Sequence, residues 1–288
     1  ALRHAALYEG YGLVYGQLSQ RGLARSPTEP PIITPADGRI PPGGAGLEIN
    51  ITTAAGSIYY TLDGSDPRLE GNRVAASATR FTGPFNLPRS AEIQARTLRR
   101  GIWSNLIEKS FGTDVSALRI SEIHYNPRPA DEDSPVSQQD LEFIELVNTS
   151  EEALDLTGVH FSKGVEFDFT SSAVLDLAPG EFVVVVKNIE AFATRYDVGR
   201  ILIAGEYRGN LANAGEELEL RDALGEVIIG FSYSDSWDPQ TDGQGFALEL
   251  ADPGLEIELL GSPASWRSSP VMDGTPGFGE KPPAPGGL

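Results

Sequence analysis

Residues 58–68 read IYYTLDGSDPR, and this stretch decides the fold. Its isoleucine, tyrosines and threonine favour an extended strand. The Asp63-Gly64 pair then supplies a tight reversal, because glycine adopts a positive φ at little cost. Asp66 can hydrogen-bond to its own backbone just before Pro67. The stretch predicts a small antiparallel β module, and no chemistry follows from it.

The sequence around this stretch keeps a period of two, which is typical of strands with one buried face. Leu47, Ile49 and Ile51 alternate with polar residues, and SIYYTL, ATRFTGPFNL, AEIQARTL and EKSFGT follow at short spacing. Turn residues separate these runs. We expect six or seven strands before Asp114 and an immunoglobulin-like β-sandwich over residues 29–114.

A second series of strand patterns begins at Leu118. It reads LRISEIHY, EFIELVN, LDLTGVHFS, VEFDFT, EFVVVVKN, ELELRD, GEVIIGFSY and GFALEL, with one short helix expected at IEAFATRY. The VVVV run should be the most buried strand, because it is apolar on both faces. The pattern predicts a second immunoglobulin-like domain over residues 115–280, closed by a strand-poor wrap after Trp266.

The two ends of the chain have a different character. Apolar residues at helical spacing, followed by six prolines in a short stretch, predict that residues 1–28 are a helix and linker from a preceding domain. Residues 281–288 are expected to be a disordered tail. Met272 is the only methionine, so we expect the chain to be part of a longer protein whose targeting signal is missing.

Composition limits the classes of function. The chain has 40% hydrophobic residues and no cysteine, and no apolar run approaches the roughly 20 residues of a membrane helix. Residues 115–280 carry nine basic and 31 acidic side chains, which is a net charge of −22. Such a surface repels phosphate backbones. We therefore expect no membrane insertion and no nucleic-acid partner.

Two resemblances follow from these motifs. GSIYYTLDGSDPR and AEIQARTLRRGIWSN resemble the small, fibronectin III-like β domain at the C-terminus of chitobiase and β-hexosaminidase-type proteins, over about residues 30–114. SEIHYNP, EFIELVN, LDLTGVHFS, LAPGEFVVVVKN and WRSSPVMDGTPG together resemble a bacterial lamin-tail domain, over about residues 117–279. The first module is an accessory in those proteins and carries no catalytic residues to transfer.

The order of the modules resembles the C-terminal region of large secreted bacterial proteins whose preceding domain is similar to spore coat protein H. That resemblance implies a non-catalytic spacer or adhesion region, located outside the cell or in the cell envelope. Its implied partners are a protein or polysaccharide at the cell surface and the preceding domain of the same chain. Kinase-like activity of that preceding domain is not implied for this chain.

Residues 238–249, DPQTDGQGFALE, nearly fit a calcium-binding EF-hand loop. Asp238, Asp242 and Glu249 occupy the first, fifth and twelfth places, and a glycine occupies the sixth. Gln240 stands where Asp or Asn is expected, and the flanks read as strands. A loop that leads into a strand explains the same residues, so calcium is one of two interpretations.

A second calcium candidate is the acidic insertion RPADEDSPVSQQD. Asp131, Asp133 and Asp140 could offer carboxylate oxygens to a hard cation, although such runs of charge also occur as solvated loops. These two candidates leave a calcium-dependent surface-binding module as one alternative function.

The EFIELVN strand places a glutamate on each face. Glu142 shares a face with Ile144, and Glu145 lies on the opposite face. At least one carboxylate must therefore lie among apolar side chains, where it needs a partner such as Arg119, His124 or backbone N–H groups. A structural role is the expectation. If the chain were an enzyme, this would be the place for its acid.

No catalytic motif accompanies this strand. No HExxH, GxSxG or P-loop pattern occurs, so we predict that the chain is not an enzyme. The other alternative function is a carbohydrate-binding module, because exposed aromatic rings can stack on sugars. The candidate rings are Tyr59, Tyr60, Trp103, Trp237 and Trp266.

Overall fold

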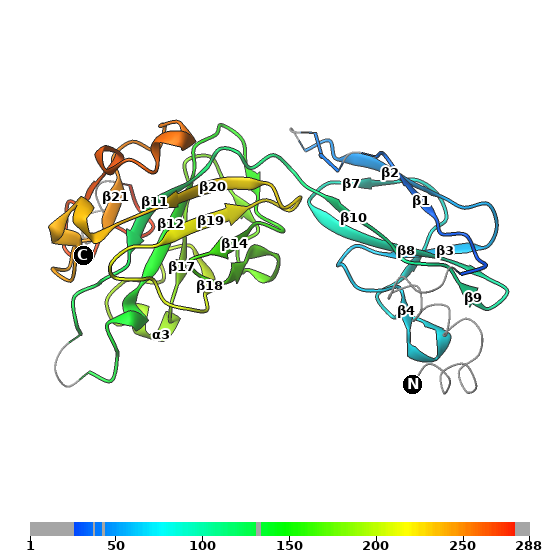
Figure 1. The fold of residues 1–288 in the computed structure, drawn as a ribbon, viewed down its shortest axis with the longest axis horizontal. Helices are drawn as coiled ribbons and strands as arrows, with labels where there is room; N and C mark the ends of the chain where they lie inside the picture. The colour runs from blue at the N-terminus through cyan, green and yellow to red at the C-terminus, as the bar shows by residue number, and fades with distance from the viewer. Residues whose placement is uncertain (1–25, 37, 42–43, 131–133, 280–288) are drawn as a thin grey trace. The chain divides into compact units, whose positions relative to one another are not determined.

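The computed structural model describes residues 26–36, 38–41, 44–130 and 134–279. The chain divides into two compact units, Ala1–Thr113 and Asp114–Leu288. Both units are built almost entirely of strands (Figure 1), so the predicted all-β class with immunoglobulin-like sandwiches is confirmed. Within the described ranges, no helix is long and apolar enough to cross a membrane. The predicted N-terminal helix and the tail at 281–288 lie outside the described residues.

The first unit has more strands than the six or seven predicted, because several are only two residues long. Its ten described strands are β1 (Ile32–Thr34), β2 (Leu47–Thr52), β3 (Ser57–Thr61), β4 (Arg68–Leu69), β5 (Arg73–Val74), β6 (Thr79–Arg80), β7 (Phe85–Leu87), β8 (Ala91–Arg99), β9 (Ile102–Trp103) and β10 (Ile107–Phe111). One sheet has the order β1-β2-β7, and the other has the order β10-β8-β3-β6 with β9 beside β8. A 3₁₀ turn, η1 (Glu70–Asn72), joins β4 to β5.

The core of the first unit lies between these two sheets. Ile49 and Ile51 of β2 face Ile93 of β8 and Phe111 of β10, and all four side chains are fully or almost fully buried. The alternation predicted for β2 is therefore observed, with its polar residues on the outer face.

The Asp63-Gly64 reversal does not form a simple hairpin. Gly64 has the predicted positive φ of 69°. However, β3 pairs with β8 and β6, and it makes no ladder with β4, which follows the turn. The Gly64 N–H donates to the Glu92 carbonyl oxygen of β8 at 3.0 Å. The turn therefore positions its loop against β8.

The described residues of the second unit, 114–130 and 134–279, form two larger sheets and one short helix. Its strands are β11 (Leu118–His124), β12 (Phe143–Asn148), β13 (Leu154–Asp155), β14 (His160–Lys163), β15 (Phe167–Asp168), β16 (Asp176–Leu177), β17 (Phe182–Val186), β18 (Ile203–Glu206), β19 (Glu217–Arg221), β20 (Val227–Ser232), β21 (Leu248–Leu250) and β22 (Trp266–Ser268). The helix is α3 (Ile189–Phe192), and it lies inside the predicted IEAFATRY segment. The 3₁₀ turns are η2 (Gln139–Leu141), η3 (Phe169–Ser171), η4 (Asp235–Trp237), η5 (Pro239–Thr241), η6 (Ile257–Leu259) and η7 (Pro263–Ser265).

The larger sheet has the order β18-β17-β12-β11-β21-β22, and it packs on the sheet β15-β14-β19-β20. Ile144 of β12 and Val185 of β17 meet Leu220 and Ile229 in the main core. All four valines of β17 are fully buried, as the sequence predicts. This burial requires a cover on both faces of the larger sheet.

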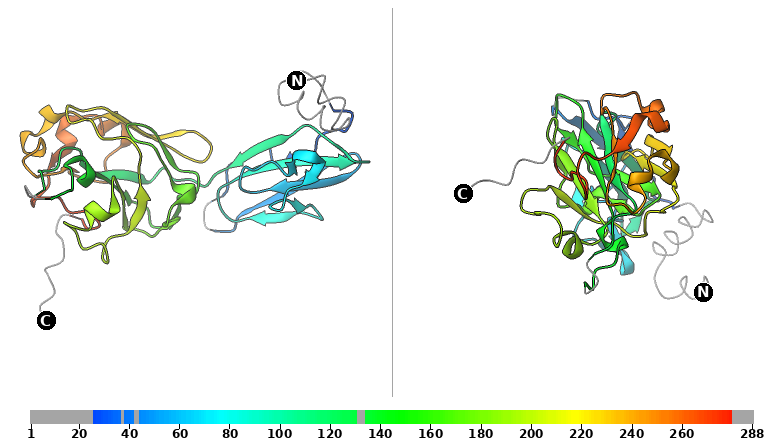
Figure 2. Two further views of the ribbon diagram at one scale, coloured as in Figure 1. Left: turned by 90° about the horizontal axis from the view of Figure 1, so that it is seen from below. Right: turned by 90° about the vertical axis from the view of Figure 1, so that its left-hand side faces the viewer.

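The second face of the larger sheet is covered by α3 and by the C-terminal segment. A small cluster of Phe143, Val184, Val186, Phe192 and Ile201 fills the space under α3. The C-terminal segment, orange to red in Figures 1 and 2, lies against this sheet and crosses from β11, where Thr275 bonds to Glu122, to β12, where Gly277 bonds to Glu145. This outer face holds the ionisable side chains that could serve a function.

Candidate functional site

Three glutamates form a row across the outer face of the larger sheet. Glu122 of β11 is paired in register with Glu145 of β12 on one side and with Glu249 of β21 on the other. Their exposed fractions are only 1%, 2% and 7%. Carboxylates directly opposite each other on neighbouring strands repel. Such a row is stable only if other groups hydrogen-bond to it or if it carries protons.

Residues 271–278 (VMDGTPGF), which we call the C-terminal strap, supply those groups. The backbone N–H of Thr275 donates to both carboxylate oxygens of Glu122, at 3.0 and 3.1 Å. The N–H of Gly277 donates to Glu145 at 2.6 Å, and the Ser121 hydroxyl donates to its other oxygen at 2.7 Å. The strap is therefore bound to the sheet through buried carboxylates.

The sequence DGTPG in the strap follows from this close approach. Gly274 has a φ of 78°, and a Cβ there would lie 2.3 Å from a carboxylate oxygen of Glu122. At Gly277, a Cβ would lie 3.0 Å from the Ile201 side chain. A side chain at either position would push the strap away from the sheet.

Burial changes the ionisation of two glutamates in this row, Glu122 and Glu145. Burial, followed by the charge of Glu145, raises the pKa of Glu122 well above its usual value. Burial also raises the pKa of Glu145 to about 8, although the hydrogen bonds from Ser121 and Gly277 oppose the shift. The loss of hydration therefore raises the pKa of Glu145 by more than the hydrogen bonds lower it. Glu249 is held in an ion pair with Arg267 at 3.1 Å.

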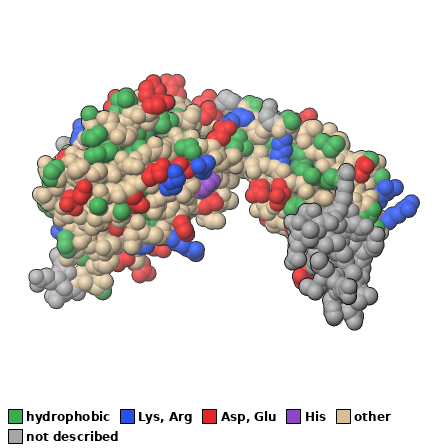
Figure 3. Space-filling model, viewed as in Figure 1, with side chains coloured by type: hydrophobic (Ala, Val, Ile, Leu, Met, Phe, Trp, Pro, Cys, Tyr) green, Lys and Arg blue, Asp and Glu red, His purple; other side chains and the backbone are tan. Residues whose placement is uncertain are grey.

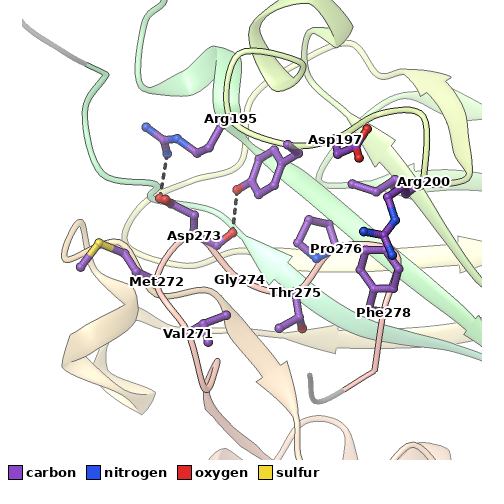
Figure 4. Close-up of a pocket in the computed structure, with 12 residues that line it drawn as sticks. Arg195, Asp197, Arg200, Val271, Met272, Asp273, Gly274, Thr275, Pro276 and Phe278 are labelled. Carbon is purple, nitrogen blue, oxygen red and sulfur yellow. Dashed lines mark hydrogen bonds and ion pairs between the residues drawn. The ribbon is translucent and has the colours of Figure 1, made fainter. Parts of the chain in front are cut away.

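Asp273 anchors the strap at its N-terminal end (Figure 4). Its carboxylate pairs with Arg128 at 2.8 Å and with Arg195 at 3.2 Å. The Tyr196 hydroxyl donates to the Asp273 carbonyl oxygen at 2.6 Å. Three side chains from two distant segments thus fix one residue of the strap.

His124 lies beneath this anchor and is almost completely buried. Its ring packs against Phe143 with centroids 5.3 Å apart, and neither ring nitrogen has a hydrogen-bond partner. Burial lowers the pKa of His124 to about 3, and the charge of Asp273 opposes this shift. His124 is therefore neutral at physiological pH.

A pocket of about 300 Å³ opens beside the strap (Figure 4). Arg195, Tyr196, Asp197, Arg200 and Ile201 form one side, and the strap forms the other. The Arg200 guanidinium lies over the Phe278 ring at 5.8 Å from its centroid. The pocket is lined by two arginines, by the carboxylates of Asp197 and Asp273, and by apolar side chains, and this pocket is the candidate functional site.

The sequence interpretation missed this pocket and found part of the carboxylate pattern. Glu142 and Glu145 are both buried, on opposite faces, as the alternation predicts. Backbone N–H groups, one of the three predicted kinds of partner, bond to both carboxylates together with hydroxyls, whereas the other two candidates, Arg119 and His124, do not. The only local signal for the strap was the MDGTPG turn motif, which does not show what the strap covers.

Glu142 lies apart from the row. It accepts a hydrogen bond from the Tyr207 hydroxyl at 2.9 Å and another from the Leu211 N–H at 2.8 Å. Burial raises its pKa to about 7, while these two bonds oppose the shift. The Tyr207 and Leu211 contacts tie the loop after β18 to β12, which is a structural role.

The three candidate ligands of the predicted EF-hand loop each interact with a different part of the chain. Asp238 accepts from the N–H groups of Gln240 and Ser268, at 3.0 and 2.9 Å. Asp242 accepts from the Asn126 amide at 2.6 Å, and Glu249 lies on β21 in the glutamate row. Each of the three has a partner within the chain. Calcium binding by this loop remains a prediction.

Only one residue of the second calcium candidate, Asp140, lies within the described residues. Asp131 and Asp133 lie outside the described residues. Asp140 accepts from the backbone N–H and the hydroxyl of Ser137, at 3.0 and 2.6 Å. Across the part of the chain that the structure describes, no group of three or more His, Asp or Glu side chains is arranged to hold a metal ion.

The aromatic candidates for sugar stacking are mostly used in packing. Trp103 is fully buried and Trp266 is 6% exposed, while Trp237 packs against the main core. Tyr60 stacks on Phe85 with centroids 4.9 Å apart. Tyr59 is half-buried and meets the edge of Trp103. The two buried tryptophans cannot form an exposed platform for a sugar.

The fold defines an all-β protein of two tandem immunoglobulin-like sandwiches. Residues 47–111 match the family model described as Fn3 associated, and residues 112–235 match the model described as Lamin Tail Domain. The two matches support an arrangement of an Fn3-like domain followed by a lamin-tail-like domain. The strands β21 and β22 lie beyond the second match, yet they pair within the same sheet.

Two further comparisons add little. One solved structure, a DUF4876 family protein from Bacteroides thetaiotaomicron VPI-5482, is 12% identical and covers 62% of this chain and 77% of its own, with a TM-score of 0.31. A likeness at that score carries no argument. No curated protein matches the chain.

Proposed function

We propose that this chain is a non-catalytic accessory region that mediates contact between a larger secreted or cell-surface protein and its surroundings. The observation that carries the proposal is how the buried carboxylates are used. Glu122, Glu142 and Glu145 each accept hydrogen bonds from the chain's own backbone. Their shifted pKa values follow from burial in structural positions, and such shifts occur in structural networks as well as in active sites.

The finer parts of the proposal rest on the order of the motifs. The first unit is proposed to be a chitobiase C-terminal-type module, and the preceding domain of the full protein is proposed to be similar to spore coat protein H. In this arrangement the two sandwiches act as a spacer or adhesion region outside the cell or in the cell envelope. The matches to the Fn3 associated and Lamin Tail Domain models support an accessory role.

The charge of the second unit restricts its partners. Asp and Glu side chains are spread over the face of this unit that Figure 3 shows, and its sequence carries 31 acidic side chains against nine basic ones in residues 115–280. Such a surface favours partners with basic groups, or partners that dock at its few cationic places. A nucleic acid is disfavoured.

The test is binding of the purified, fluorescently labelled chain to intact cells of the producing organism. We expect saturable binding that protease treatment of the cells removes and that polysaccharide digestion leaves in place. Loss of binding only after polysaccharide digestion would support a carbohydrate-binding module instead. Absence of saturable binding to treated and untreated cells would contradict the adhesion role.

A further inference from the structure

Cationic side chains gather around the strap pocket, although the unit is strongly acidic. Residues 115–280 carry nine basic side chains, and three of these are Arg128, Arg195 and Arg200. Arg195 and Arg200 line the pocket, and Arg128 pairs with Asp273 at its rim. The acidic surface around this place would steer other anions away, so an anionic ligand that binds here must be recognised by local contacts.

Arg200 is an exposed cation with a fixed position. Its guanidinium lies over the Phe278 ring, and a cation above an aromatic face is attracted to it. Among the described residues, its side chain makes no ion pair or hydrogen bond. The nearby Asp197 carboxylate accepts from the Gly199 N–H at 3.3 Å. The planar donors of Arg200 therefore remain open to a carboxylate, which they fit in a bidentate manner.

Arg195 adds a second, more deeply placed cation. Its side chain is 10% exposed, and its Nη2 donates to the Arg128 carbonyl oxygen at 3.2 Å. Its Nη1 is buried and lies 3.2 Å from the Asp273 carboxylate, so this cation belongs to the anchor of the strap and leaves Arg200 as the exposed cation of the pocket.

The rest of the pocket is apolar. Val271 is 39% exposed and Met272 is 53% exposed, and both line the pocket with Ile201, Pro276 and Phe278. Figure 4 shows Pro276 between the Arg195–Asp273 pair and the Arg200–Phe278 pair. An aliphatic group lying on Pro276 would thus have the Arg195–Asp273 ion pair on one side and the Arg200 cation on the other. Exposed methionine suits such contacts because its side chain adapts to different shapes.

We propose that the strap pocket binds an extended peptide segment of a partner protein, in which a carboxylate lies next to an aliphatic side chain. The carboxylate pairs with Arg200, and the aliphatic side chain packs on Pro276, Val271 and Met272. This inference rests on the proposed function, because it names the partner class and the place where the partner docks. An anionic sugar fits less well, since one face of Phe278 is already occupied by Arg200 and no flat aromatic platform remains.

The test uses the full chain and a blocked hexapeptide with one aspartate between two leucines. In NMR titrations we expect saturable shifts of the Met272 methyl group and of the Arg200 Nε–H. Replacing the peptide's aspartate by asparagine should weaken binding about tenfold, as expected for loss of a charge-assisted hydrogen bond. The R200Q variant should weaken binding of the aspartate peptide by a similar factor.

The matched control is R208Q, because Arg208 is also exposed but lies outside this pocket. It should bind the aspartate peptide like the unchanged chain, and all variants should keep the melting temperature. Equal binding of the two peptides, or equal weakening by R200Q and R208Q, overturns the proposal. So does binding of a uronic-acid trisaccharide in the absence of peptide binding.

The cell-binding assay separates this inference from the proposed function. If R200Q still binds cells like the unchanged chain, the accessory role stands and the strap pocket is not the docking place. If the chain binds the peptide but not the cells, the pocket stands and the adhesion role fails.

Discussion

Arg96 shows how one buried charge organises the loop of the first unit. It is fully buried, and its guanidinium donates to both carboxylate oxygens of Asp66, at 2.8 and 2.7 Å, and to the Ser104 carbonyl at 2.7 Å. Asp66 also accepts from the Arg68 N–H, as its turn role predicts. The aspartate of the DGSDPR loop is therefore both a turn residue and the partner of a buried cation.

Replacing Asp66 by alanine should destabilise the first unit by about 3 kcal/mol, because it leaves Arg96 buried without its counter-charge. The control is D63A, since Asp63 is exposed and bonds only within its turn. Urea unfolding should show a much smaller loss for D63A. Equal losses for the two variants would contradict the importance of the buried pair.

A second prediction at the residue scale concerns Gly274. Alanine there must adopt a φ of 78° and place its Cβ against Glu122, whereas alanine at Gly180 adopts a φ of 70° with no atom within 4 Å of its Cβ. Both variants carry backbone strain of about 1–2 kcal/mol. In chemical unfolding, only G274A should lose more free energy of unfolding than this. The difference between G274A and G180A measures the contact between the strap and the Glu122 carboxylate. Similar losses of unfolding free energy in the two variants would show that the strap can move away from Glu122 without a loss of stability.

At the scale of elements, the strap, β11 and β12 form one titrating assembly. Glu145 lies opposite Glu122 on the neighbouring strand β11 and accepts a hydrogen bond from Gly277 of the strap. Burial makes the protonated form of Glu145 the favoured one at neutral pH. The stability of this region therefore depends on pH.

The direction of this dependence follows from a pKa of about 8 in the fold against 4.5 for a free glutamate. A raised pKa stabilises the fold below pH 4.5, and this contribution is lost as the pH rises from about 4.5 to about 8. In the variant E145Q, the free energy of unfolding should decrease less steeply with pH over this window. The control E217Q removes an exposed carboxylate and should leave the slope as it is. An unchanged slope in E145Q would contradict the burial argument.

His124 should make the stability of the fold depend on pH in the opposite direction. Its pKa is lowered to about 3 from an ordinary 6.5, so its contribution to stability is present above pH 6.5 and is lost as the pH falls toward 3. The variant H124L should therefore resist acid unfolding better than the unchanged chain. H160L is the control, because His160 is only half-buried in another sheet. If both variants respond to acid alike, the buried ring is not the cause.

At the scale of the whole molecule, each unit has its own core. Phe111 belongs to the core of the first unit, and Leu220 belongs to the main core of the second. Because the described core residues of the two units form separate clusters, we expect calorimetry to show two transitions. F111A should destabilise the first unit and L220A the second, each by about 3 kcal/mol or more, so that each variant lowers the temperature of a different transition. A single transition that both variants lower together would show that the units unfold as one.

The calcium prediction also concerns the whole chain. If the loop at 238–249 binds calcium in the native state, millimolar calcium raises the melting temperature after chelation. The variant D238N should then remove most of that rise, and magnesium should not replace calcium. An unchanged melting temperature leaves the carboxylates of this loop in their hydrogen-bonding roles.

The strand pattern was predictable because its cause is local. Alternation along residues 47–52, the VVVV run and the turn glycine each limit the backbone within a few residues, and the structure agrees with all three. The glutamate row was not predictable in this way. The register of β11 shifts between Ile120 and Glu122, so that Glu122 leaves the face of Ile120 and lies opposite Glu145. A bulge of this kind leaves no clear mark in the sequence.

The sequence by itself determined the all-β class, the places of most strands and the presence of a glutamate on each face of β12, because periodicity and turn chemistry act over short distances. Only the tertiary structure decided which groups bond to those carboxylates, that Asp66 partners Arg96, and that the strap meets residues 195–201 around a pocket. A buried charge requires a partner. The identity of that partner depends on contacts between residues up to 153 positions apart, as between Glu122 and Thr275.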